Sequence, residues 1–425
     1  MEKNDYIMSI DIGTTKIVAM IGRVNAHGRI EVVAQHRVDS QGVWRGIVEN
    51  IDDASYSIKD CLDGLYKQTD VRQRNVIVGI AGSHISSTQN NTSILRANSS
   101  ATITEGEVLK MQRDMYKIAL KPGQEILQIL AQDYVIDGEP VAKAVGRRGS
   151  KLTGNYHIVL GETASISNIR ACVERCGLAL KKLVLEPLAS ADATLTKEER
   201  EAGVALLDIG GGTSDLAVLY QNTVRGTYVI PCGGELITND IRHICNIPRR
   251  KAELVKCRFG SCLSDCASAD QKIVFGKAGD SEARLVTGKT LAGIIQDRME
   301  QIIDSVRYRI NESGYGDRIQ SIVLTGGSSQ MRHLPQLVKL RTGLDARIGY
   351  PTVLVAAEGK PRDLDPTKST SVGLMMSGYE EMVAAAGQPA LLQHLPGWLI
   401  GKRLVKNIVG RFDRVFEEDE HVIPS

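Results

Sequence analysis

Two stretches of the chain repeat one pattern of apolar and polar positions. Residues 9–20 (SIDIGTTKIVAM) and residues 207–218 (LDIGGGTSDLAV) each contain an apolar strand, a carboxylate, a glycine turn with hydroxyl residues and a second apolar strand. An alignment that allows one extra residue in the second turn pairs Asp11 with Asp208. The repeated pattern predicts a duplicated domain.

The segments around both stretches extend the repeat. Each half is expected to hold three strands in succession, followed by a helix with apolar residues three to four positions apart. The expected strands of the first half cover residues 6–11, 16–23, 29–37 and, after a helix over 50–68, residues 75–80. The second half has strands at residues 204–208, 215–220 and 224–231 and a helix from about residue 234.

Residues 84–162 do not fit this order. Helical spacing covers residues 105–120 and 126–131, while short apolar strands cover residues 132–136 and 156–160. The mixture predicts a small α+β insertion in the first half of the chain.

A third glycine turn follows later in the chain. Residues 321–331 (SIVLTGGSSQM) form an apolar strand that runs into the pair Gly326–Gly327, before a helix expected over residues 334–340. Because glycine has no side chain, a flat base or ribose can lie directly against the backbone there.

Turns of this kind suit phosphate groups. Without a Cβ, neighbouring backbone N–H groups can point together into a concave anion site, and Thr or Ser hydroxyls add donors. A carboxylate just before the turn repels phosphate, so its useful role is to hold a hydrated Mg²⁺ that bridges the phosphates. One glycine turn is usually only a tight turn, but two opposed copies would hold a nucleotide from both sides.

The size and composition of the chain fit a soluble protein with more than one lobe. Its 425 residues exceed one ordinary core, and 42% hydrophobic with 24% charged residues is typical of globular proteins. A net charge of +2 gives no reason to expect nucleic acid as a partner. The polar residues 1–6 do not resemble a signal peptide, and no apolar run could span a bilayer, so a cytoplasmic location is expected.

Eight cysteines are expected to be reduced in that location. Cys257, Cys262 and Cys266 lie close together in the sequence, but their spacing lacks the paired Cys-x2-Cys units of a zinc site. Ordinary thiols are therefore the favoured interpretation, and a metal site is the alternative.

The end of the chain carries an amphipathic pattern. A linker is expected over residues 381–397 and a helix over residues 398–417, with apolar residues on one side and basic residues opposite or beside them. The apolar side includes Trp398, Leu404, Val405, Ile408, Val409, Phe412 and Phe416, and the basic residues include Lys402, Arg403 and Lys406. This pattern favours a helix that lies on an anionic membrane surface, and the alternative is a C-terminal helix docked on the body.

The order of the three turns resembles the actin-like ATPase superfamily, which includes actins, heat-shock chaperones, sugar kinases and bacterial cytoskeletal proteins. Within it, residues 149–159 resemble the end of subdomain 1C of the bacterial division family FtsA, and residues 252–260 and 289–295 resemble its subdomain 2B. The resemblance covers residues 5–380 and the tail. It implies an α/β fold of two actin-like, ribonuclease-H-like domains with a 1C insertion and a C-terminal amphipathic helix. The implied subdomains are 1A (1–83 and 163–195), 1C (84–162), 2A (196–236), 2B (237–312) and, over residues 313–380, the second part of 2A and the return to 1A.

The resemblance also implies which residues meet ATP and Mg²⁺. The phosphates would meet Gly13, Thr14, Thr15 and Lys16 on one side and Gly210, Gly211, Gly212, Thr213, Gly233 and Gly234 on the other, while Asp11 and Asp208 would hold Mg²⁺ through water. The ribose edge would meet Glu253 and Lys256, and the adenosine would meet Gly326, Gly327 and Ser328. Glu186 matches a glutamate that faces the nucleotide in the chaperones and MreB, and it either positions a water for hydrolysis or only caps a helix.

The implied function is that of an ATP-binding protein that polymerises on the inner face of the cytoplasmic membrane at the division septum. Its partners would be the C-terminal peptide of the tubulin-like FtsZ, on subdomain 2B, further copies of itself in a head-to-tail filament, and later division proteins through 1C. One alternative is a sugar or acid kinase, which needs a base near an acceptor hydroxyl that the sequence does not offer. Another is a nucleotide-binding adaptor of a pilus or secretion platform, against which the 1C-like insertion argues.

Overall fold

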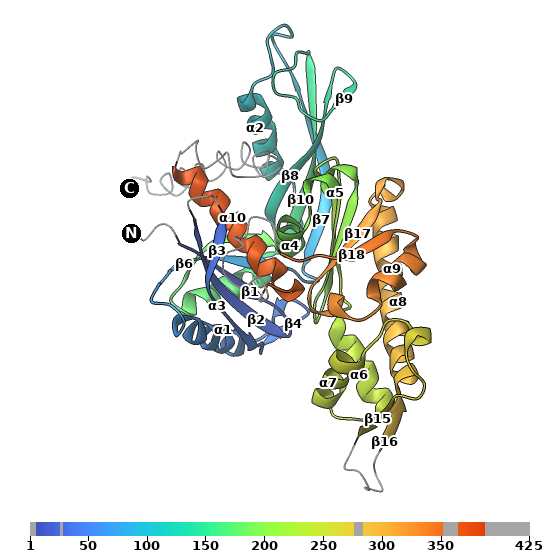
Figure 1. The fold of residues 1–425 in the computed structure, drawn as a ribbon. Helices are drawn as coiled ribbons and strands as arrows, with labels where there is room; N and C mark the ends of the chain where they lie inside the picture. The colour runs from blue at the N-terminus through green and yellow to red at the C-terminus, as the bar shows by residue number, and fades with distance from the viewer. Residues whose placement is uncertain (1–5, 26–28, 276–283, 352–363, 387–425) are drawn as a thin grey trace.

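The computed structural model of the protein describes residues 6–25, 29–275, 284–351 and 364–386 (Figure 1). Its centre is formed by ten strands: β1 (Tyr6–Ile12), β2 (Lys16–Val24), β3 (Ile30–Asp39), β6 (Asn75–Ile80), β11 (Ala179–Leu185), β12 (Val204–Ile209), β13 (Ser214–Tyr220), β14 (Thr223–Ile230), β17 (Ser321–Thr325) and β18 (Asp345–Ile348). They form two five-stranded sheets, β3–β2–β1–β6–β11 and β14–β13–β12–β17–β18. In each sheet, the three strands that come first in the sequence pair antiparallel with one another. The other two run parallel to the first of these three, which is β1 in one sheet and β12 in the other. The predicted duplication is confirmed.

Helices cover both faces of the first sheet. On one face lie α1 (Ile51–Tyr66) and α3 (Thr163–Arg175), and the Asn50 side chain caps α1 by accepting hydrogen bonds from two backbone N–H groups of its first turn. The residues of α1 at helical spacing, including Ala54 and Ile58, are buried against the sheet. The other face is covered by α10 (Ser369–Ala386), whose Met375 packs with Met20 of β2.

Two helices connect the two lobes of the protein. The first lobe is built on the sheet that contains β1, and the second lobe on the sheet that contains β12. The helix α4 (Glu186–Thr194) lies between α10 and the second sheet, where Leu188 packs with Leu206 and Ala217. The approach of α10 to α4 is close, because a Cβ on Gly373 would lie 1.9 Å from the Ala189 carbonyl oxygen. The short helix α5 (Lys197–Ala202) then leads into β12.

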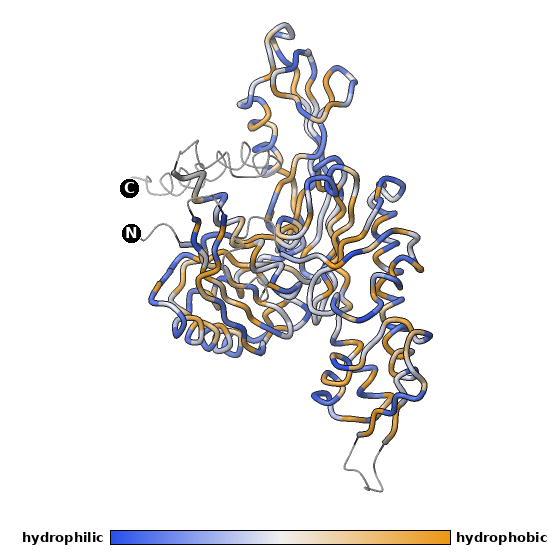
Figure 2. Tube along the Cα trace, in the orientation of Figure 1, coloured by the Kyte–Doolittle hydropathy of each residue, from blue (hydrophilic) through white to orange (hydrophobic). Residues whose placement is uncertain are grey.

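The second lobe carries most of the remaining helices. Around its sheet lie α6 (Gly234–Cys245), α7 (Arg249–Phe259), α8 (Gly288–Glu312) and α9 (Leu334–Thr342), and β15 (Lys272–Phe275) pairs with β16 (Arg284–Thr287). A short hairpin of β4 (Val43–Trp44) and β5 (Ile47–Val48) belongs to the first lobe. Figure 2 shows apolar positions along the central strands and polar positions on the outer turns of the helices.

The insertion is a four-stranded sheet with one helix. Its strands lie in the order β7 (Ile85–Leu95), β10 (Lys151–Glu162), β8 (Gln124–Ile136) and β9 (Glu139–Val141), and α2 (Glu105–Asp114) packs on the sheet. The insertion stands at one end of the molecule, and α6, α7, β15 and β16 stand at the opposite end (Figure 1).

Two expectations about the elements are wrong. Residues 126–131 form part of the 13-residue strand β8, not a helix, because pairing with β10 along nearly the whole strand outweighs the helical spacing of their apolar residues. The helix α10 ends at Ala386, so it continues into the expected linker that begins at residue 381. The expected amphipathic helix at residues 398–417 lies outside the described residues. Within the described residues, no helix is long and apolar enough to cross a bilayer.

Candidate functional site

The two repeated glycine turns face each other. The backbone N–H of Gly13 donates to the Lys16 carbonyl at 3.0 Å, and that of Gly210 donates to the Thr213 carbonyl at 2.9 Å. Both turns therefore have the same length, and the extra residue expected in the second turn is absent. A Cβ on Gly212 would lie 2.4 Å from Thr14 Oγ1, so the glycines let the two turns approach across the space between the lobes.

The second turn is joined to the start of α6. The N–H of Gly234 donates to the Gly210 carbonyl at 2.9 Å, and a Cβ on Gly233 would lie 2.5 Å from the Gly211 carbonyl oxygen. The N–H of Glu235 likewise donates to the Gly211 carbonyl at 2.9 Å, so the second turn caps the start of α6. These bonds fix the turn to the helix and hold its glycines in place opposite the first turn.

The third glycine turn, at Gly326 and Gly327, lies against the carboxylate of Asp208. Gly326 has a positive φ of 85°, and a Cβ there would lie 2.3 Å from Asp208 Oδ1. The glycine is therefore required by the close approach of the turn to Asp208, in addition to any contact with a ligand. The Ser328 hydroxyl donates to the Gly210 carbonyl at 3.4 Å, which brings the second and third turns together.

Lys256 and Glu253 lie beside the start of α6. The Lys256 ammonium donates to the Gly234 carbonyl at 2.9 Å and to the Thr238 hydroxyl at 2.8 Å, and it forms an ion pair with Glu253 at 2.8 Å. The two residues predicted for the ribose edge thus belong to the same region as the second turn and Ser328.

Four carboxyl groups gather between the turns. Asp11, Asp208 and Asp215 are at least nine-tenths buried, and Glu186 at the start of α4 is partly buried, with its side chain against Gly79 of β6. Asp208 and Asp215 lie directly opposite each other in the antiparallel pair β12–β13, so both side chains point to the same face of the sheet. Like charges in this arrangement repel, which favours a cation between them.

The raised pKa values of these carboxyl groups also favour a bound cation. Burial raises the pKa of Asp215 to about 8, with a further contribution from Asp208, and burial raises the pKa of Asp11 to about 6 against the opposing attraction of Lys16. Burial and the neighbouring Asp11 raise the pKa of Glu186 well above its ordinary value. A bound cation would restore the charged forms.

Hydrogen bonds fix two of the carboxylates. Asp208 accepts from the Ser190 hydroxyl at 2.7 Å and the Thr370 hydroxyl at 3.3 Å, while Asp215 accepts from Thr213 at 3.0 Å. Among the described residues, Asp215 Oδ1 is buried without a hydrogen-bond partner. An unsatisfied carboxylate oxygen beside other carboxylates fits a hydrated Mg²⁺, although no group of three such side chains in the described part of the chain is placed to ligate a metal directly.

Lys16 brings a positive charge to the four carboxyl groups. Its ammonium donates to the Thr367 carbonyl, and its charge partly offsets the rise in the pKa of Asp11 and Glu186. A lysine at the turn can exchange that carbonyl for a phosphate oxygen, because both are acceptors. Such an exchange would compensate the negative charge of a nucleotide.

Two parts of the site do not follow from the sequence pattern. Asp215 follows the second turn, and its equivalent in the first half is Val18, so the comparison of the two repeats hid it; the equal turn length is the signal that places it opposite Asp208. The other part is Gly46 of the β4–β5 hairpin, whose N–H donates to the Thr14 hydroxyl at 3.1 Å. Its sequence carries only ordinary turn residues.

The cysteines do not form a common site. Cys262 is buried, whereas Cys257 and Cys266 are exposed. In the ranges that the structure describes, no cluster of His, Cys, Asp or Glu side chains suits a metal ion.

Comparison with solved structures defines the class of the fold. The chain is similar to a PilM–PilN complex of type IV pilus biogenesis (TM-score 0.63, 15% identity, 88% of this chain and 98% of that one). It is also similar to MreB5 of Spiroplasma citri bound to ADP (TM-score 0.55, 12% identity, 91% and 100%). These likenesses, together with the duplicated sheets and facing turns, show a protein with the actin-like ATPase fold.

Sequence comparison then gives the family. Residues 205–373 match the family model "Cell division protein FtsA", and residues 82–160 match "SHS2 domain inserted in FTSA". The FtsA proteins of Pseudomonas aeruginosa and Neisseria meningitidis are 35% and 34% identical to it, over 90% and 88% of this chain and 91% and 90% of theirs. The chain belongs to the FtsA family of cell division proteins. This membership decides against the kinase and the pilus-platform alternatives.

Proposed function

We propose that this protein binds ATP with Mg²⁺ between its lobes, polymerises, and ties FtsZ filaments to the inner face of the cytoplasmic membrane at the division septum. The observation that carries the nucleotide site is the pair of facing turns around four buried or half-buried carboxyl groups and Lys16. Fold relatives support it, because two structures of MreB5 of Spiroplasma citri hold bound ADP and AMPPNP.

The roles of the residues follow from their positions. Thr14, Thr15 and the backbone of the two turns would donate hydrogen bonds to the phosphates, and Lys16 would neutralise part of their charge. Asp11, Asp208 and Asp215 would hold a hydrated Mg²⁺ through its water molecules, and the metal would offset the repulsion among the phosphates. Glu186 is the remaining carboxyl group that faces this space, so it is the candidate to position a water for hydrolysis.

The nucleotide site is tested with purified protein and a fluorescent ATP analogue. We expect Lys16→Ala to weaken binding by tenfold or more, because a charge-assisted hydrogen bond contributes about 1.5–3 kcal/mol. The matched control is Lys59→Ala, which removes an exposed lysine from α1. Equal affinities of both variants and the original protein would contradict the site.

The proposed FtsZ site is the unit formed by α6, α7, β15 and β16. Four apolar side chains of this unit are exposed: Ile244 by 64%, Leu254 by 54%, and Val274 and Leu285 by 53% each. A protein-binding surface needs exposed apolar residues, although single ones also occur on other surfaces. They support the assignment of the C-terminal peptide of FtsZ to subdomain 2B, since a short peptide needs apolar contacts for its affinity.

A peptide-binding assay tests this surface. Ile244→Glu should abolish binding of the labelled C-terminal peptide of FtsZ, because it places a charge among the apolar contacts. Leu340→Glu is the control, since Leu340 is 71% exposed on α9, outside this unit. If Ile244→Glu binds the peptide as well as the control does, FtsZ uses another surface.

A further inference from the structure

Asp208 is held by two hydroxyl groups from outside its own sheet. It lies in β12, whereas Ser190 belongs to α4 and Thr370 to the first turn of α10. The Ser190 hydroxyl donates to Asp208 Oδ2 at 2.7 Å, and the Thr370 hydroxyl donates to the same oxygen at 3.3 Å. The two hydroxyl oxygens lie 3.1 Å apart. We call these three side chains the hydroxyl–carboxylate cluster.

The hydroxyl–carboxylate cluster is closed to solvent. Ser190 is fully buried, and Thr370 and Asp208 are more than nine-tenths buried. A hydrogen bond to a charged group is stronger than one between neutral groups, and a buried acceptor that loses its donor finds little water to replace it. The two hydroxyls therefore have a strong influence on the orientation of the Asp208 carboxylate.

Both hydrogen bonds end on the same carboxylate oxygen, and this sets the direction of the other one. Oδ1 points toward the third glycine turn, where a Cβ on Gly326 would lie 2.3 Å from it. The last torsion of an aspartate is only loosely defined by itself, so donors from two different helices restrict it. Oδ1 is thus kept on the side of the glycine turns, and Asp215 lies on the same face of the sheet.

The first turn of α10 is anchored in both lobes. The Ser9 hydroxyl of β1 donates to the Ser371 carbonyl at 3.0 Å. The hydroxyl oxygens of Thr325, at the end of β17, and of Ser369 lie 2.6 Å apart. Because its neighbours on both sides are fixed, Thr370 has little freedom to follow a moving carboxylate. Its hydroxyl is therefore a fixed donor that limits the movement of the carboxylate.

The helix α4 links the hydroxyl–carboxylate cluster to Glu186. Ser190 follows Glu186 by four residues, so the two side chains lie on the same side of α4, one turn apart. Leu188 packs this helix against the sheet that carries Asp208. One helix therefore holds both the carboxyl group that is the candidate to position a water and the hydroxyl that orients Asp208.

We propose that Ser190 and Thr370 are positioning residues of the nucleotide site: they orient Asp208 so that Oδ1 faces the water shell of bound Mg²⁺. The inference rests on the proposed ATP site and goes beyond it, because both residues act through Asp208. Loss of a group that hydrogen-bonds a metal-binding side chain typically costs about 10- to 100-fold in metal affinity. Since Asp208 would reach Mg²⁺ through water, the lower end of this range is expected. The first turn of α10 would then belong to the nucleotide site.

A Mg²⁺ titration of ATP binding tests this role in the full chain, with a fluorescent ATP analogue as the probe. Ser190→Ala should raise the Mg²⁺ concentration for half-maximal binding about tenfold and leave the Kd measured in EDTA unchanged. Thr370→Val should act in the same direction with a smaller effect, because its bond to Asp208 is longer. Thr370→Ser keeps the hydroxyl and should keep the original Mg²⁺ dependence.

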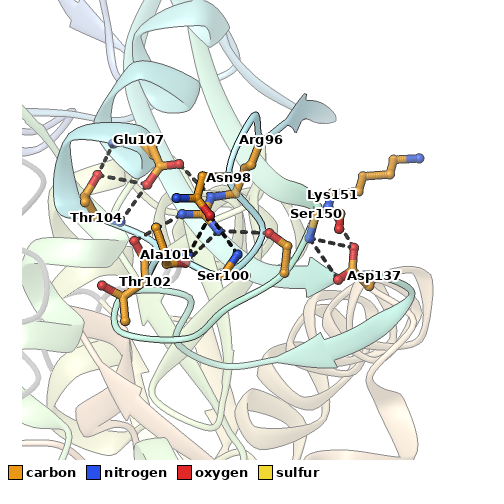
Figure 3. A network of polar contacts seen from close by, with 11 residues as sticks. Arg96, Asn98, Ser100, Ala101, Thr102, Thr104, Glu107, Asp137, Ser150 and Lys151 are labelled. Atoms are coloured by element: carbon orange, nitrogen blue, oxygen red, sulfur yellow. Dashed lines mark hydrogen bonds and ion pairs between the residues drawn. The ribbon is translucent and has the colours of Figure 1, made fainter.

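A hydroxyl–carboxylate bond away from the nucleotide site provides the control. At the outer end of the insertion, the Thr104 hydroxyl donates to Glu107 Oε2 at 2.9 Å, and Thr104 caps α2 (Figure 3). Thr104→Val removes this bond and the cap. Urea unfolding should therefore show a loss of stability, while the Mg²⁺ titration stays unchanged.

Two results would overturn the inference. If Ser190→Ala and Thr370→Val weaken ATP binding equally in EDTA and in Mg²⁺, the hydroxyls only support the fold. If their Mg²⁺ titrations coincide with that of the original protein, Asp208 does not need them. If the original protein binds ATP no more tightly with Mg²⁺ than in EDTA, the proposed Mg-ATP site itself fails. Urea unfolding shows whether each variant is folded, and the comparison of Thr370→Val with Thr370→Ser decides the question if Ser190→Ala does not fold.

Discussion

Replacement of Asp215 by Asn should stabilise the protein without ligand and weaken its binding of Mg-ATP. Asp215 is 4% exposed and lies opposite Asp208. Asn has nearly the same shape, and its carbonyl oxygen can still accept the hydrogen bond from Thr213. The substitution therefore removes the charge and leaves the packing almost unchanged.

The size of the stabilisation follows from the pKa. Burial raises the pKa of Asp215 from 3.8 to about 8, so the folded chain keeps a proton that the unfolded chain releases. The free energy of unfolding therefore falls as the pH rises between about 4 and 8. At pH 7 the loss amounts to about 4 kcal/mol at about 1.4 kcal/mol per pKa unit, and Asp215→Asn should recover most of it.

Urea unfolding at pH 5 and pH 8, without nucleotide, measures this effect. The original protein should lose more stability than Asp215→Asn between the two pH values, and the variant should be the more stable at pH 8. In contrast, the affinity for Mg-ATP should fall at least about tenfold, because a charged contact to the hydrated metal is lost.

A surface substitution gives the control for the change in net charge. Asp60→Asn removes an exposed carboxylate from α1 and should alter neither property. If Asp215→Asn has the same pH dependence as the original protein, Asp215 is charged in the folded state. The idea that the site is destabilised until a cation binds would then be wrong.

Three other substitutions test the remaining parts. Gly326→Ala should abolish ATP binding measured by a fluorescent analogue, because its Cβ would meet Asp208 at 2.3 Å; unchanged affinity would remove the third turn from the site. Leu95 lies at the end of β7 and is 84% exposed, so Leu95→Glu should reduce sedimentable polymer and leave ATP affinity unchanged. Persistent polymer would place the contact between subunits elsewhere. Removal of residues 398–425 should release the protein from anionic vesicles in a co-sedimentation assay, and Trp398→Glu with Phe412→Glu should act alike; pelleting of the truncated protein would favour the docked-helix alternative.

The sequence was informative where local pattern and tertiary structure agree. Strands β1, β6 and β12 are short apolar runs bounded by polar turns, and their predicted bounds are correct within one residue. Only residues 126–131 of β8 were mispredicted, because Ile126, Leu127 and Leu130 have the spacing of a helix, whereas the partners that make them a strand lie in β10, about 30 residues later. Single-sequence periodicity carries no information about such partners.

The residues of the site also fall into those that the local sequence pattern reveals and those that depend on distant partners. Asp11 and Asp208 could be found because each stands two residues before the first glycine of a repeated turn. Asp215 could not be placed without the register of β12 and β13, and the contact of Gly46 with Thr14 joins positions 32 residues apart. The docking of Gln132 on β14 spans 92 residues and depends entirely on how the lobes pack.

The packing of α10 has a mechanical consequence. The expected membrane-binding segment follows this helix in the sequence, so tension between a membrane and the body would enter through α10. The helix lies along α4 and β1, with Gly373 against the backbone of Ala189. A pull along the helix axis would have to shear all of these contacts at once, whereas a pull across it would peel them one turn at a time. The protein should therefore resist axial force far better than transverse force.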